Sequence, residues 1–214
     1  SVITPDDGQT LPEALIEAME DAESGAVLQL PKNSDVELSL KELGNALLMD
    51  GNVGKSVTLD LNGSTLKSTD GYSMNVPVSG ELILVNGSVQ QYNLPGNSKS
   101  AITIDTGARL ILRDVDVSSN GCSIFPEGDA SEVLIDGGSV RGASFGVATN
   151  NTTSDNIHIS LMDTEIGAYN DADGFTGVMI NVPGLLEIEN CKIVGDYQGI
   201  IVRGSTAVIK DTNV

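Results

Sequence analysis

The sequence is poor in aromatic residues, in cysteine and in basic residues. Its 214 residues include no tryptophan, four tyrosines, three phenylalanines and two cysteines. Two cysteines are too few for a disulfide framework, and their spacing matches no zinc motif. Eleven basic residues stand against 30 acidic ones, which gives a net charge of −19. Because this charge repels nucleic acid and anionic lipid, we expect neither as a partner.

Long apolar runs are missing as well. No stretch of about 18 apolar residues occurs, and residues 1–8 lack the basic and apolar regions of a signal peptide, so we predict no membrane insertion. Glycine is abundant, with 24 residues, and Asp, Asn, Val and Ile are common. This composition favours short strands joined by tight turns over long helices.

A short pattern recurs along the chain at intervals of 21 to 28 residues. An apolar residue, the anchor, is followed five positions later by a second apolar residue, with turn-forming residues between them. Further short strands lie upstream, as in Ile102–Ile104, Val178–Ile180 and Ile200–Val202. Two or three strands per repeat of this length are typical of one coil of a β-solenoid. The copies are Leu61–Leu66, Leu84–Val89, Leu112–Val117, Ile135–Val140, Leu161–Ile166, Ile188–Ile193 and Ile209–Val214.

Equivalent positions in the seven copies form columns if the coils stack about 4.8 Å apart. The second residue after the anchor is always Gly, Asn or Asp, which best tolerate the left-handed backbone of a sharp corner. The third residue is small and is predicted to point inward, and the fourth is polar and is predicted to point outward. The corner residues are Gly63, Asn86, Asp114, Gly137, Asp163, Asn190 and Asp211.

These repeats, with units such as Ile188-Glu-Asn-Cys-Lys-Ile193, resemble the right-handed parallel β-helix superfamily of pectate lyases, polygalacturonases and phage tailspikes. The resemblance covers residues 27–214 and implies an all-β, right-handed parallel β-helix solenoid. For the enzymes of the superfamily it also implies carboxylates on one face, which activate water or hold Ca²⁺ beside an Arg or Lys. The polygalacturonase motifs Asn-Thr-Asp, Gly-His-Gly and Arg-Ile-Lys are absent from the sequence.

Both ends of the solenoid lead to predictions. Thr10 and Glu13 have the spacing of a capping box, and Pro12 suits the first turn, so we predict a capping α-helix over residues 11–23. The chain then divides into an N-terminal segment with this helix, residues 1–26, and a β-helix, residues 27–214, with an irregular insertion over 41–56. The last repeat stops at Val214 in mid-coil, so we expect the chain to be truncated and a further C-terminal domain or subunit to cover the open end.

One group of candidate catalytic residues lies on the regular coils. Asp114, Asp116 and Arg113 are flanked along the stack by Asp136 and Arg141, as a lyase site would require. The alternative is that they are ordinary corner and outward-facing residues of the column pattern.

A second group lies in a single turn. Asp171 and Asp173 give Asn170-Asp-Ala-Asp-Gly174 the centre of a calcium loop, but Tyr169 takes the place of the first ligand and the distal Glu is missing. A surface turn is the alternative. Tyr169 and Tyr197 are candidate ligand-binding residues, because exposed aromatic rings stack on sugars; an aromatic stack between coils is the alternative.

The remaining reactive side chains have structural interpretations. His158, between Ile157 and Ile159, is predicted to face solvent or a neighbouring coil. Cys122 and Cys191 belong to coils three steps apart, about 14 Å at the strand spacing, too far for a disulfide. We therefore predict two free, buried thiols.

The leading hypothesis is a non-catalytic module of a secreted or cell-surface protein from a bacterium or phage. It would serve as an adhesin, a stalk or a binding surface for a glycan or host surface protein, and would need no cofactor. The alternatives are part of a polysaccharide lyase or glycoside hydrolase, for which Ca²⁺ is a candidate cofactor, and a trimeric tailspike-like depolymerase.

Overall fold

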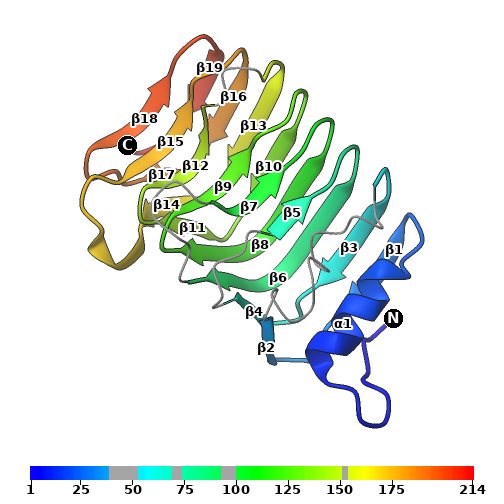
Figure 1. Cartoon of the computed structure of the whole chain (residues 1–214). Coiled ribbons are helices and arrows are strands. Elements are labelled where there is room, and N and C mark those ends of the chain that lie inside the picture. Colours follow the sequence, from blue (N-terminus) through cyan, green and yellow to red (C-terminus); the bar gives the residue numbers. More distant parts are fainter. Residues whose placement is uncertain (39–52, 69–73, 93–99, 151–153) are drawn as a thin grey trace.

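Parallel strands stack into a solenoid with three faces and one helix at its N-terminal end (Figure 1). This computed structural model describes residues 1–38, 53–68, 74–92, 100–150 and 154–214. It confirms the all-β class and the parallel solenoid predicted from the repeats. Residues 41–52 of the expected insertion lie outside the described residues.

The first and second faces belong to one sheet of thirteen strands. Each strand pairs in parallel with its counterparts in the adjacent coils. The first face contains β1 (Ala26–Gln29), β3 (Ser56–Asp60), the first part of β6 (Glu81–Gln91) and of β8 (Arg109–Ser119), β10 (Glu132–Asp136), β13 (Ile157–Met162), β16 (Gly184–Glu189) and β19 (Thr206–Lys210). The second face contains β2 (Asp35–Leu38), β4 (Thr65–Ser68), the remaining parts of β6 and β8, β11 (Ser139–Gly142), β14 (Glu165–Ala168) and β17 (Lys192–Ile193).

The third face is a separate sheet of six strands, and none of its strands contains a charged residue. Strands buried on both sides are expected to be uniformly apolar, and all five residues of one of them, β15, are buried. Outside the main core, Cys122, Ala148 and Met179 form a second apolar cluster with Phe125, Phe145 and Ile201. The strands are β5 (Met74–Val76), β7 (Ser100–Ile104), β9 (Cys122–Pro126), β12 (Phe145–Thr149), β15 (Thr176–Ile180) and β18 (Gln198–Val202).

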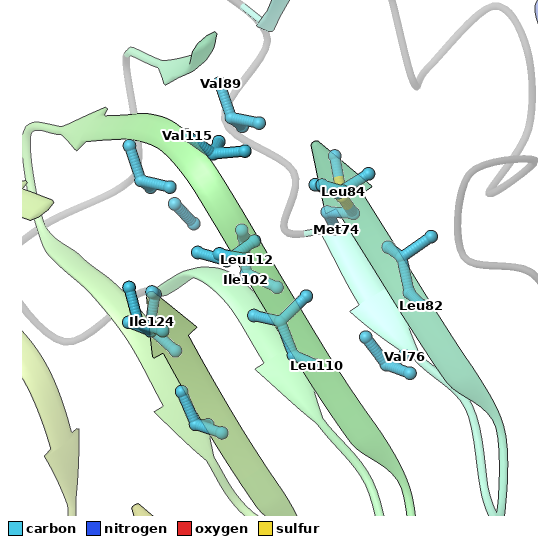
Figure 2. Packing of buried hydrophobic residues seen from close by; sticks show 14 of the residues in the cluster. Met74, Val76, Leu82, Leu84, Val89, Ile102, Leu110, Leu112, Val115 and Ile124 are labelled. Carbon is cyan, nitrogen blue, oxygen red and sulfur yellow. The ribbon is translucent and has the colours of Figure 1, made fainter. Parts of the chain in front are cut away.

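Inward-pointing residues of successive coils stack into apolar columns, because side chains alternate along each strand. Figure 2 shows Leu82 and Leu84 of β6 beside Leu110 and Leu112 of β8. The leucines of β8 are packed near Ile102 of the third face. The register confirms the predicted anchor column from the second copy onward. That column contains Leu84, Leu112, Ile135, Leu161, Ile188 and Ile209.

The first copy departs from the prediction. The partner of Leu84 is Leu59, whereas the sequence pattern assigned Leu61 to that position. Thr65 and Leu66 nevertheless pair with Ser88 and Val89 as predicted, so the first corner contains two extra residues. Leu61 is fully buried there, and a Cβ atom on Gly87 of the next coil would lie 2.4 Å from its Cβ. The absence of a side chain at Gly87 is what leaves room for Leu61.

The corner column is confirmed in every copy. The predicted corner residues all have positive φ, between 46° at Asp211 and 77° at Gly137. The small residues that follow also point inward as predicted: Ser64, Val115, Thr164 and Cys191 are buried. At Gly138, an added Cβ would lie 2.2 Å from the carbonyl oxygen of Val115, so no larger residue fits.

The N-terminal helix covers the first coil. α1 (Leu11–Glu20) has the predicted capping box, in which Thr10 accepts from the N–H of Glu13 and the Glu13 side chain accepts from the N–H of Thr10. It ends three residues earlier than predicted, and buries Leu15 and Met19 against the core. None of the described residues forms a helix that is long and apolar enough to cross a membrane.

Candidate functional site

The candidate catalytic residues of the regular coils lie among contacts between neighbouring coils. Arg113 stands opposite Asp136 in the register of β8 and β10. Asp116 accepts a hydrogen bond from Ser139 Oγ, with the two oxygens 2.7 Å apart. Asp114 occupies the corner, where its Oδ1 would lie 2.4 Å from a Cβ added to Gly137. Asp114 and Asp116 therefore occupy the corner and outward positions that the column pattern predicts, and Arg113 is exposed beside them.

Arg141 takes part in a different cluster from the one the sequence suggested. Its guanidinium lies 2.8 Å from Glu165 Oε1, one coil further on, and Lys192 Nζ lies 3.9 Å from the same oxygen. The hydrogen bond from Arg141, followed by the charge of Lys192, lowers the pKa of Glu165 below its usual value. This cluster is a surface ion network on the second face.

A ladder of charged residues on the first face was not predicted from the sequence. Arg109 lies 2.7 Å from Glu132 and 3.1 Å from Glu81, in the coils on either side. The hydrogen bond to Glu132 is the main reason why the pKa of Arg109 is raised. In the next coil, His158 Nε2 lies 2.8 Å from Glu187 Oε2, so His158 contacts a neighbouring coil as predicted. All of these residues except Glu187 lie three positions before an anchor, so counting back from each anchor could have found them.

The turns between the second and third faces change length along the stack. Two residues separate Ser119 from Cys122, and two separate Gly142 from Phe145. In the next two coils, seven residues separate β14 from β15 and four separate β17 from β18. The longer of these turns, residues 169–175, projects from the stack between β14 and β15 (Figure 1). Both long turns contain candidate residues named from the sequence.

Two hydrogen bonds from backbone N–H groups hold these long turns together. The N–H of Gly174 donates to Asp196 Oδ2 at 2.6 Å, and the N–H of Tyr197 donates to the carbonyl of Phe175 at 3.0 Å. A groove of about 400 Å³ lies between the turns. We call it the turn groove, and it is lined by Ala168, Asp171, Ala172, Val194, Gly195 and Asp196.

The two candidate tyrosines have different surroundings. The ring of Tyr169 lies 5.9 Å from that of Tyr92, at an angle of 43°, so this ring is part of a contact between coils. Tyr197 is 72% exposed and directly follows Asp196 of the turn groove. Of the two candidate tyrosines, Tyr197 is thus the one whose side chain is open to a ligand.

The candidate calcium ligands are both exposed in the 169–175 turn. Asp171 lines the turn groove and has a φ of 52°, whereas Asp173 is not among the lining residues. Within the described ranges, no three His, Cys, Asp or Glu side chains gather in an arrangement that could hold a metal ion. Asp171 shares the lining of the turn groove with a second acidic residue, Asp196.

Cys122 and Cys191 are both free and buried, which confirms the prediction made from their spacing. Burial raises the pKa of the Cys122 thiol to about 12 and also raises that of Cys191. Neither thiol is poised as a nucleophile.

The fold and its surface contacts define the class of this protein as a parallel β-solenoid with an N-terminal cap helix. No family model and no curated protein matches the chain.

Proposed function

We propose that this chain is a non-catalytic β-helix module of a secreted or cell-surface protein from a bacterium or phage. Its role is to act as a rigid stalk or adhesin surface that presents a binding site for a glycan or host surface protein. The observation that supports this proposal is the placement of the lyase-like candidates. Asp116 bonds to Ser139 of the adjacent coil, Arg113 stands opposite Asp136 in the register, and Asp114 occupies the corner beside Gly137.

The remaining features of the proposal come from the repeat and the charge. We propose that the solenoid is a right-handed, pectate-lyase-like β-helix, because its stacked columns resemble those of that superfamily and right-handed crossovers are the rule for parallel strands. A net charge of −19 favours an exposed, soluble surface and disfavours nucleic acid. Val202, Val208 and Ile209 are exposed in the last coil, and we propose that a further domain or subunit covers them.

Incubation with polysaccharides tests the absence of catalysis. We expect no new reducing ends and no unsaturated products from pectins, alginates or neutral glycans, with or without Ca²⁺. Depolymerisation that is lost in Asp116→Asn and Arg113→Gln would overturn the proposal in favour of a lyase or hydrolase.

Two physical measurements test for a calcium cofactor and for a trimeric depolymerase. A melting temperature that is the same in CaCl₂ and in EDTA supports a module without a calcium cofactor, because a bound ion would stabilise the native state. A trimer in light scattering, together with glycan cleavage, would instead identify a tailspike-like depolymerase.

A further inference from the structure

The turn groove combines two kinds of surface that rarely meet on the regular coils. Val194, which lines the groove, is 53% exposed. Tyr197, the residue that follows the lining residue Asp196 in the chain, is 72% exposed. Two acidic residues, Asp171 and Asp196, line the same groove, and Asp196 also accepts a hydrogen bond from the N–H of Gly174. Its volume of about 400 Å³ falls in the range of small-molecule sites, roughly 300–1,000 Å³.

The electrostatics of the groove select against anions. None of the six residues that line it is Lys or Arg. The nearest cation along the chain, Lys192, lies 3.9 Å from the carboxylate of Glu165. A ligand that suits the groove therefore has hydrogen-bond donors for the carboxylates, an apolar face for the side chains, and no negative charge.

We infer that the turn groove binds an uncharged oligosaccharide. A pyranose ring has hydroxyl groups that donate to Asp171 and Asp196, and a C–H face that stacks on the ring of Tyr197. Charge-assisted hydrogen bonds of this kind are stronger than neutral ones, and aromatic stacking adds apolar burial. The groove is held open without a ligand, because Gly174 and Phe175 bond to the turn that carries Tyr197.

This inference rests on the proposed function, since it names the ligand that the module would present. The test is a glycan array followed by titration calorimetry and saturation-transfer NMR, with cello-, xylo- and manno-oligosaccharides as probes and oligogalacturonate as the anionic comparator. We expect an uncharged oligosaccharide to bind and oligogalacturonate to bind at least about tenfold more weakly.

Two variants test the residues. Tyr197→Ala should weaken binding by about tenfold or more, as for an aromatic at the centre of a binding site. Asp171→Asn keeps a residue that tolerates left-handed backbone and should weaken binding several-fold. The matched control is Asp211→Asn, because Asp211 is also exposed and has a positive φ of 46°. Its affinity should equal that of the unmodified protein.

Each contrary result has a separate meaning. Failure of every uncharged probe at millimolar concentration, unchanged affinity in Tyr197→Ala, or preference for oligogalacturonate would overturn the inference while leaving the non-catalytic module intact. Cleavage of a bound glycan would overturn the proposed function while leaving the groove as its binding site. If Ca²⁺ binds but no glycan does, and Asp171→Asn abolishes the Ca²⁺ binding, the inference is overturned and the turn groove is an ion site instead.

Discussion

The anchor column allows one substitution to be compared at two degrees of burial. Ile188 and Ile209 are register partners in β16 and β19, but Ile188 is 1% exposed and Ile209 is 46% exposed. Replacing Ile by Ala removes three carbon atoms, worth about 2.4 kcal/mol if fully buried, and the cavity left behind brings the usual cost to about 2–5 kcal/mol.

Ile188→Ala should therefore lower the free energy of unfolding by about 3 kcal/mol. Ile209→Ala should lower it by roughly 1 kcal/mol, because about half of that side chain is already in water and less of a cavity forms. Urea denaturation followed by far-UV circular dichroism measures both, since the chain has no tryptophan to report on unfolding. Hydrogen exchange in β16 and β19 then shows whether each loss is local.

Either of two results would refute this reasoning. A loss below about 1 kcal/mol for Ile188→Ala would mean that the column is not tightly packed. Equal losses in the two variants would mean that Ile209 is covered in solution. Light scattering on the same samples would show whether a second copy provides that cover.

Three further predictions concern the corner, the second face and the thiols. Asn190→Ala should destabilise the chain by about 1–2 kcal/mol in urea denaturation, because Asn190 has a φ of 51°, whereas Asn190→Gly should cost less than half as much. The lowered pKa of Glu165 should be visible as a carboxyl titration below 4.5 in NMR, and Arg141→Met should raise it; the stabilisation is present above pH 4.5 and is lost as the pH falls through the lowered pKa. Cys122, with a pKa of about 12, should resist Ellman's reagent at pH 8 in the native protein and react after unfolding.

The sequence was sufficient to predict the solenoid because its constraints are local. A corner needs a residue that tolerates left-handed backbone, and Gly, Asn or Asp marks it in every copy. The pattern failed at the first copy for an equally local reason. Leu59 and Leu61 are two residues apart and both are buried, so alternation alone could not decide which one pairs with Leu84.

Contacts between coils were harder to predict than the coils themselves. The Arg109 ladder is visible only when the outward residues three positions before successive anchors are compared with one another, across a repeat of variable length. Tyr92 and Tyr169 are far apart in the sequence, yet their rings meet. The sequence named Tyr169 and Tyr197 together, but the structure places the ring of Tyr169 against Tyr92 and leaves Tyr197 exposed.

The same regularity indicates where a binding site can lie on this protein. A polar residue on a regular coil has a neighbour about 4.8 Å away on each side, so its hydrogen-bonding groups tend to be used within the stack. Asp116 and Glu165 are examples. Such a residue becomes available to a ligand where the repeat is interrupted. After two coils with two-residue connections between the second and third faces, the next connections have seven and four residues, and these two turns form the turn groove. Asp171 and Tyr197 are exposed in these turns, and Asp196 lines the groove while it also accepts from the N–H of Gly174. Binding is therefore expected at this interruption of the column pattern.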